Sequence, residues 1–191
     1  METAEKLFSD KGFEGTSVRN IAKAANVNIA MISYYFGSKE KLLEALFTYR
    51  MADFRMEVES VIAKNNSYFE TLDEIVALIV FRVHRNRRTH KIINIEYSNK
   101  SRQIDFDNYV NQKKENLKVI GDFVKRGQQD GVFTKDVNLQ LIIPTILGTY
   151  FHFYFSKRFY QNFMGLEDYA TIEHYVHNAL TQHIQQTITA L

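Results

Sequence analysis

Chain-breaking residues are scarce in this sequence, and that scarcity limits the folds it can adopt. Among 191 residues there is one proline, Pro144, and there are eight glycines. A β-sandwich needs a turn about every ten residues, and such turns draw on glycine and proline. Apolar residues instead recur at helical spacing, as in Val18, Ile21, Ala22 and Ala25. Because 45% of the residues are hydrophobic, the chain can bury a core. The sequence therefore predicts an all-α fold.

Composition removes several function classes. Cysteine is absent, which excludes disulfides, thiolate nucleophiles and cysteine-bearing metal sites. The longest nearly apolar run, residues 141–155, is shorter than the roughly 20 residues of a membrane-spanning helix. No signal-peptide pattern opens the chain, so we expect a soluble, cytoplasmic protein. No nucleophile–base set and no glycine-rich phosphate loop can be singled out, so we expect neither an enzyme nor a cofactor.

The first 45 or so residues read as three short helices followed by a long fourth one. Residues of capping type mark the helix ends: Gly12, Thr16 or Ser17, Asn26, Asn28, Gly37 and Ser38. Only about three residues separate the second helix from the third, which is the spacing of a helix-turn-helix. The fourth helix is expected to run unbroken from Ser38 to Ile62 and to join the two parts of the chain stiffly.

The rest of the chain predicts longer helices, over residues 68–87, 90–99, 105–127, 138–159 and 169–189. Pro144 and Gly148 fall inside the fourth of these, where we expect a kink that opens a cavity.

Residues 12–46, GFEGTSVRNIAKAANVNIAMISYYFGSKEKLLEAL, carry the most specific signal. The Gly-Phe-x-Gly-Thr-Ser opening, the Ile-Ala-x-x-Ala helix and the aromatic run before Gly37-Ser38-Lys39-Glu40 resemble the DNA-binding domain of the TetR family of bacterial transcriptional regulators. The resemblance implies a helix-turn-helix DNA-binding domain over 1–45 and a helical effector-binding and dimerisation domain over 46–191.

In function, the resemblance implies a ligand-responsive regulator, by default a repressor. It would bind a pseudo-palindromic double-stranded DNA operator as a homodimer and be released by a small-molecule effector. The alternative is a TetR-like DNA-binding protein that answers to a protein partner or acts architecturally. The first helix is shortened relative to family members, so either the native start lies upstream or contacts from a basic arm are missing.

By the same resemblance, the third helix contacts base edges and its aromatic pair contacts phosphates. The residues expected at the DNA are Thr16, Ser17, Arg19, Asn28, Ile29, Ala30, Ser33, Tyr34, Tyr35, Lys39 and Lys41. Whether Ile29 contacts a base or packs inside is left open. Charge agrees with this placement, because residues 15–41 hold four cations against one carboxylate, a net +3. The whole chain is only +2.

The effector pocket is expected in the second domain, where eight of the fourteen residues from 150 to 163 are aromatic. These aromatics predict a core and dimer face, a pocket for an apolar or aromatic effector, or both in part. The candidate wall residues are Phe81, His84, Tyr97, Tyr109, Phe123, Phe151 and Phe155. As in the family, the helices near 138–159 and 169–189 are expected to form the dimer interface.

Two further patterns leave alternatives open. Residues 82–102 carry seven cations, including Lys100 and Arg102, against Glu96. These cations either complement the helix dipole at the C-terminal end of a helix or bind an anionic group of an effector. His174 and His177 lie at i, i+3, a spacing that can share a metal ion. No third ligand is evident in the sequence, so we predict no metal site.

Overall fold

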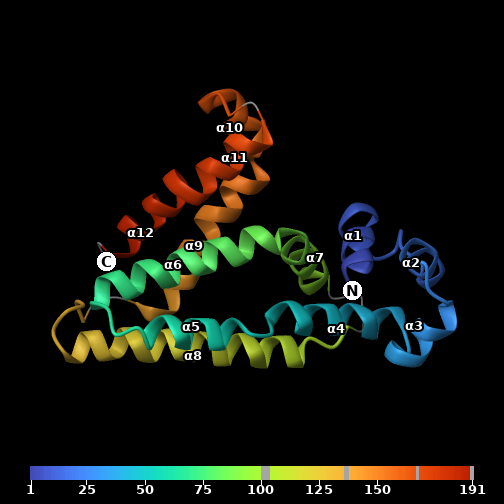
Figure 1. Ribbon diagram of the computed structural model, residues 1–191, viewed down its shortest axis with the longest axis horizontal. Coiled ribbons are helices and arrows are strands. Elements are labelled where there is room, and N and C mark those ends of the chain that lie inside the picture. Colours follow the sequence, from blue (N-terminus) through green and yellow to red (C-terminus); the bar gives the residue numbers. More distant parts are fainter. Residues whose placement is uncertain (100–103, 136–137, 167, 190–191) are drawn as a thin grey trace. The chain divides into compact units, whose positions relative to one another are not determined.

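The computed structural model describes residues 1–99, 104–135, 138–166 and 168–189 (Figure 1). Every regular element in these ranges is a helix, which confirms the all-α prediction. In chain order they are α1 (Glu2–Lys11), α2 (Val18–Ala25), α3 (Ile29–Phe36), α4 (Lys39–Met51), α5 (Phe54–Ile62), α6 (Tyr68–Arg85), α7 (Arg87–Ser98), α8 (Asp107–Gln129), α9 (Leu139–Phe155), α10 (Lys157–Met164), α11 (Tyr169–Tyr175), the π-helical turn η1 (Val176–Leu180) and α12 (Thr181–Thr189). Among the described residues, no helix is long and apolar enough to cross a membrane.

The chain forms two compact units, each made from two stretches of sequence. The first unit comprises Met1–Phe54 and Asn86–Glu115, and the second comprises Arg55–Arg85 and Asn116–Leu191. The helix-turn-helix therefore shares a unit with α7 and with the beginning of α8. The functional boundary expected after residue 45 stays a prediction, since compactness alone does not assign roles.

In the first unit, α1 to α4 enclose a core that α7 completes. α1 packs against α2 and α7, while α3 packs against α2 and α4. Leu43 and Leu46 are fully buried, and Ile92 and Ile93 of α7 belong to the same cluster. Burying a large aliphatic side chain stabilises a fold by about 1.5–3 kcal/mol. The three-helix segment thus depends on residues far along the chain for part of its core.

A buried carboxylate ties three helices of the first unit together. Glu5 of α1 is 6% exposed. It accepts a hydrogen bond from the Thr89 hydroxyl of α7 at 2.5 Å and forms an ion pair with Arg50 of α4. Lys91 of α7 also donates to the Ser9 carbonyl oxygen at 3.0 Å. A buried charge needs such partners, so these contacts fix α1 between α4 and α7.

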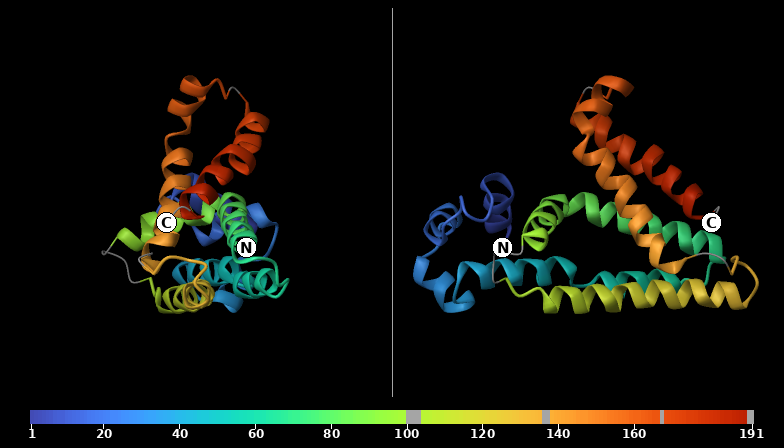
Figure 2. Two further views of the ribbon diagram at one scale, coloured as in Figure 1. Left: turned by 90° about the vertical axis from the view of Figure 1, so that its left-hand side faces the viewer. Right: turned by 180° about the vertical axis from the view of Figure 1, so that it is seen from behind.

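In the second unit, α6 packs along both α9 and α12. α9 and α12 lie side by side, and the chain passes between them through α10 and α11 at one end (Figures 1 and 2). The centre is filled by fully buried side chains that include Val76, Val80, Ile146, Tyr150 and Ile184. This packing brings α6 close to the last helices of the chain.

The prediction of one long fourth helix is wrong. α4 ends at Met51, Ala52 is extended with ψ 153°, and Asp53 is left-handed with φ 68°, before α5 begins at Phe54. Aspartate is one of the few residues with a side chain that enters this region readily, so the helix breaks without glycine or proline. The link expected between the two parts is therefore not a single helix.

The helix expected over 138–159 is also divided. The backbone of Ser156 leaves helical geometry at φ −94° and ψ 15°, and its carbonyl accepts from Phe159 and Tyr160 at 2.9 and 3.2 Å. A new helix, α10, starts from those bonds and extends to Met164. Elsewhere, the helices predicted over 68–87, 105–127 and 169–189 occur with ends shifted by two residues or fewer.

Candidate nucleic-acid interface

The turn between α2 and α3 is built by two asparagines. Asn26 ends α2 in the left-handed conformation, with φ 53° and ψ 45°. Asn28 then starts α3, because its side-chain oxygen accepts from the Ala30 backbone N–H at 2.8 Å. Both roles confirm the sequence-based expectation. An asparagine at each end of a short turn satisfies backbone groups that a helix terminus leaves open.

The segment before α2 explains the glycine-rich opening of the motif. Gly12 has φ 73°, and a Cβ on Gly15 would lie 2.3 Å from the Lys11 carbonyl oxygen. Thr16 is 1% exposed, and its hydroxyl donates to the Leu7 and Gly12 carbonyls at 3.1 and 2.8 Å. Ser17 is exposed and caps α2 by accepting from the Asn20 N–H at 3.1 Å. Of this pair, Ser17 is therefore the residue available to a ligand.

α3 presents most of its surface to solvent. Within Ile29–Tyr35, Ile32 alone is buried, at 7% exposure. Ile29 is 44% exposed, so it does not pack inside, and Tyr34 reaches 84%. The Tyr34 and Tyr35 rings meet edge to face, with centroids 5.2 Å apart. The exposed residues of the helix are Ile29, Ala30, Met31, Ser33, Tyr34 and Tyr35. Because so few of its side chains are buried, α3 can present the others to a DNA major groove.

The cations near α3 differ in their existing partners. The Lys39 ammonium donates to the Phe13 carbonyl at 3.0 Å and lies 4.0 Å from the centre of the Phe13 ring. Lys41 is paired with Glu44 at 2.6 Å, and that hydrogen bond raises the pKa of the Lys41 ammonium. Arg19 and Lys23 on α2 are both exposed. Lys23 is an exposed cation beyond the residues expected at the DNA.

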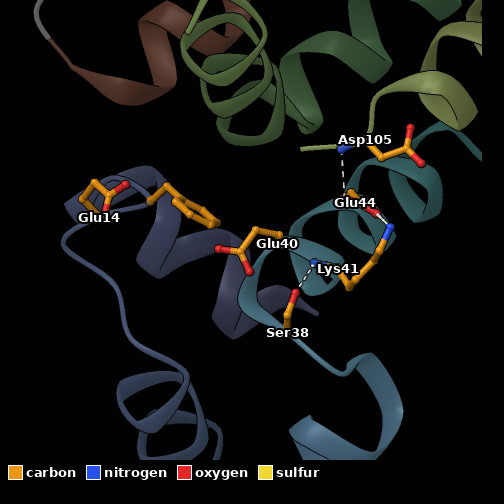
Figure 3. A pocket seen from close by; sticks show the side chains of 7 residues that line it. Glu14, Ser38, Glu40, Lys41, Glu44 and Asp105 are labelled. Atoms are coloured by element: carbon orange, nitrogen blue, oxygen red, sulfur yellow. Dashed lines mark hydrogen bonds and ion pairs between the residues drawn. The ribbon is translucent and has the colours of Figure 1, made fainter. Parts of the chain in front are cut away.

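A hollow of about 450 Å³ lies beside the start of α4 (Figure 3). Its wall consists of Phe13, Glu14, Ser38, Glu40, Lys41, Glu44 and Asp105. Ser38 caps α4 through the Lys41 N–H at 3.1 Å, and Glu44 accepts from the Asp105 N–H at 3.0 Å. Four carboxylates outnumber the single cation here. Because phosphate is anionic, this hollow is a poor place for a nucleic-acid backbone.

The seven residues expected around an effector are divided between the two units. Tyr97 and Tyr109 belong to the first unit, where both rings contact Phe106. In the second unit, Phe123 packs on Tyr68 and Phe133.

The remaining four expected wall residues are linked through shared partners. Phe81 contacts His177, His84 contacts both His177 and Tyr150, Tyr150 contacts Phe151, and Phe151 stacks on Phe155. The pocket stays a prediction, and within the second unit these four residues are connected by ring contacts. Of the basic run over 82–102, Lys100 and Arg102 lie outside the described residues. Arg82 is paired with Glu57 at 2.7 Å.

Comparison with known proteins decides what kind of chain this is. A family model described as bacterial regulatory proteins, tetR family, matches residues 1–46. A second, described as a tetracyclin repressor-like C-terminal domain, matches residues 69–188, which is more than half of the chain. The chain belongs to the TetR family. It is accordingly a transcriptional regulator of the helix-turn-helix type, in a family that binds DNA operators.

Among curated relatives, the probable HTH-type transcriptional regulator YttP of Bacillus subtilis is 41% identical over 91 residues, or 48% of this chain and 43% of that protein. The repressor KstR2 of Mycolicibacterium smegmatis is 24% identical over 156 residues, covering 78% of this chain and 73% of its own. Among solved structures, FadR of Bacillus subtilis in complex with stearoyl-CoA superposes with a TM-score of 0.76 at 18% identity, covering 98% and 95% of the two chains. At that identity the likeness establishes the fold.

Proposed function

We propose that this TetR-family regulator is a repressor that binds a pseudo-palindromic operator as a homodimer and releases it when an apolar or aromatic small molecule binds the second unit. The proposed DNA-binding surface rests on a single observation, which is the exposed face of α3. Six of the seven residues from Ile29 to Tyr35 are exposed, on a helix held by Ile32.

Within this surface, different residues have different tasks. Small or apolar side chains at Ile29 and Ala30 suit close approach and contact with a thymine methyl group. Ser33 and the amide N–H₂ of Asn28 can hydrogen-bond base edges, since only the Asn28 oxygen is used by the cap. Phosphates are contacted by Tyr34, Tyr35, Ser17 and Arg19, with Lys39 and Lys41 adding positive charge nearby.

Selection of bound duplexes from random DNA, followed by affinity measurement on the selected site, tests this assignment. We expect Tyr34→Ala with Arg19→Ala to weaken binding to all sequences and to make affinity less dependent on salt, because phosphate contacts release counterions. Asn28→Ala should instead relax sequence preference and cost about 1–3 kcal/mol of discrimination at the contacted base pair.

Asn28→Ala also removes the cap of α3, so a matched variant is needed. Asn28→Ser keeps a capping oxygen but lacks the amide donor. If Asn28 contacts a base, both variants lose sequence preference, while only the alanine variant loses stability. Unchanged binding of the selected operator by all of these variants would show that α3 is not the recognition helix.

The proposed effector class rests on the aromatic side chains of the second unit and on two related proteins. Phe81, His84, Phe151 and Phe155 are connected through their ring contacts. FadR was crystallised with stearoyl-CoA, and a KstR2 structure is described as that of a ketosteroid regulator. An effector that releases DNA must bind the DNA-free state more tightly than the DNA-bound state.

Operator binding measured with fatty acyl-CoA, steroid and aromatic probes tests this part separately. Loss of operator affinity with one probe class, abolished by Phe151→Ala, supports the small-molecule sensor. Operator binding that resists every probe but responds to a protein from the same cells would support control by a protein partner.

A further inference from the structure

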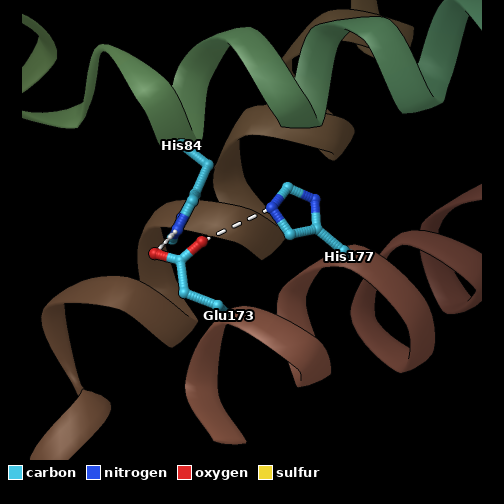
Figure 4. A group of neighbouring side chains, drawn as sticks. All are labelled: His84, Glu173 and His177. Atoms are coloured by element: carbon cyan, nitrogen blue, oxygen red, sulfur yellow. Dashed lines mark hydrogen bonds and ion pairs between the residues drawn. The ribbon is translucent and has the colours of Figure 1, made fainter. Parts of the chain in front are cut away.

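The second unit brings together three potential metal ligands that are distant in the sequence (Figure 4). His84 is on α6, Glu173 is on α11, and His177 is in the π-helical turn η1. One ligand atom from each, either an imidazole nitrogen or a carboxylate oxygen, lies within 4.8 Å of the other two. From this arrangement we propose that His84, Glu173 and His177 bind a divalent transition-metal ion of the zinc type.

The distances between ligand atoms suit such an ion after small movements. His84 Nε2 lies 2.7 Å from Glu173 Oε1, and His177 Nε2 lies 3.4 Å from Glu173 Oε2. Around zinc, bonds of about 2.0–2.2 Å in a tetrahedron separate neighbouring ligand atoms by about 3.4 Å. Opening the distance from His84 Nε2 to Glu173 by less than 1 Å brings it to the spacing of ligand atoms around zinc.

Two imidazoles and one carboxylate also have the right chemistry. This donor set occurs in zinc sites that keep a fourth position for water, whereas Mg²⁺ and Ca²⁺ prefer oxygen ligands throughout. The single carboxylate leaves a bound divalent ion with a net charge of +1. The His177 side chain is 39% exposed, so the ion and its water can be reached from solvent.

Tyr150 supplies an outer partner of the kind that metal-binding histidines have. The buried Tyr150 hydroxyl lies 2.8 Å from His84 Nδ1, which leaves Nε2 for the ion. In the metal-free protein, Nε2 can carry the ring proton and donate to Glu173. When the ion takes Nε2, the proton belongs on Nδ1. A hydroxyl can accept as well as donate, so Tyr150 suits either tautomer and fixes the orientation of the ring.

The backbone around His177 is a second, independent feature. η1 covers Val176–Leu180 as a π-helical turn inside the α11–α12 helix, and the Thr181 hydroxyl donates to the Val176 carbonyl at 2.6 Å. Such turns are rare and occur frequently at functional sites. His174, which lies at i, i+3 from His177, is oriented otherwise, since its ring and its carbonyl both contact the Asn178 amide.

Sequence reasoning missed this site because its members are far apart. His84 and Glu173 are 89 positions apart, and the histidine spacing noted in the sequence was that of His174 and His177. No signal in a single sequence joins His84 to His177. The proposal does not rest on DNA binding. It shares His84 with the effector wall proposed above, so the test below uses Zn²⁺ alone, without effector or operator.

Calorimetric titration of untagged, metal-free protein with ZnCl₂ tests the proposal directly. We expect one Zn²⁺ per chain, and a parallel titration with MgCl₂ should show no binding. His177→Ala and the nearly isosteric Glu173→Gln should each weaken Zn²⁺ binding at least tenfold, because each removes one of the three ligands. We expect both variants to fold, since neither side chain is fully buried. Tyr150→Phe should weaken it by about 10–100-fold through loss of the outer partner.

His174→Ala is the matched control, because it removes a histidine from the same helix but not from the cluster, and it should bind Zn²⁺ like the wild type. Thermal unfolding gives a second readout. Zn²⁺ should raise the Tm of the wild type and of His174→Ala, but not that of His177→Ala. Absence of stoichiometric binding, or binding that His177→Ala leaves intact, would overturn the proposal.

Discussion

Thr16 shows how a single residue of the DNA-binding motif can serve the fold instead of the ligand. Its hydroxyl donates to the carbonyls of Leu7 and Gly12, and the side chain is 1% exposed. We expect Thr16→Ala to lower the free energy of unfolding by about 1 kcal/mol, because the hydrogen bonds from the hydroxyl to the Leu7 and Gly12 carbonyls are lost. Thr16→Ser should recover most of the loss. Urea unfolding measures both variants.

Thr16→Ala, compared with Ser17→Ala, separates a structural role from a contact with DNA. At a temperature where both remain folded, Thr16→Ala should bind the operator with wild-type affinity. Ser17→Ala, one position along, should weaken operator binding, since Ser17 is exposed at the start of α2. A folded Thr16→Ala protein with weakened DNA binding would contradict this division of roles.

At the scale of elements, the break between α4 and α5 depends on the left-handed conformation of Asp53, with φ 68°. Alanine is strained in that region by about 1–2 kcal/mol, whereas glycine is not. We therefore expect Asp53→Ala to lower the free energy of unfolding by about 1 kcal/mol, and Asp53→Gly to leave it within about 0.5 kcal/mol of the wild type. Chemical denaturation measures the difference. An Asp53→Ala variant as stable as the wild type would contradict this account of the break.

Helix ends could be predicted wherever a residue with one strong preference marks them. Gly12, Asn26 and Ser38 each occupy the end that their residue type indicates. Asp53 and Ser156 gave no such warning, because apolar residues continue at helical spacing on both sides of them. In both cases the local backbone of one residue, and not the hydrophobic pattern, decides where the helix ends.

At the scale of the whole molecule, predictability follows separation along the chain. The helix-turn-helix could be predicted because its turn, caps and exposed face lie within about 35 residues. The contribution of α7 to the core of the same unit could not, since Ile92 and Ile93 lie more than 40 positions away from α4. Likewise, nothing in the sequence indicated which of the expected effector residues would be neighbours.

The proposed homodimer makes a prediction that involves the whole molecule. α9 and α10 expose Phe155, Phe159 and Phe163 at 55%, 61% and 73%, and the last two rings stack with centroids 5.6 Å apart. Aromatic side chains gathered on adjacent helices are typical of a surface that another chain covers. We expect Phe159→Glu with Phe163→Glu to convert a dimer into a monomer, as measured by light scattering.

Loss of the dimer should also weaken DNA binding. When one recognition helix of a dimer is bound, the other is held at a high effective concentration near its half-site. Avidity of this kind amounts to about 10²–10⁴-fold, so the double variant should lose that much affinity for the full operator. Its affinity for an isolated half-site should stay that of the wild type. Met56→Glu, which changes an exposed apolar residue (61%) on a different helix, α5, is the control and should stay dimeric. A double variant that remains dimeric would place the interface on other helices, while equal loss at half-site and operator would indicate damage to the fold.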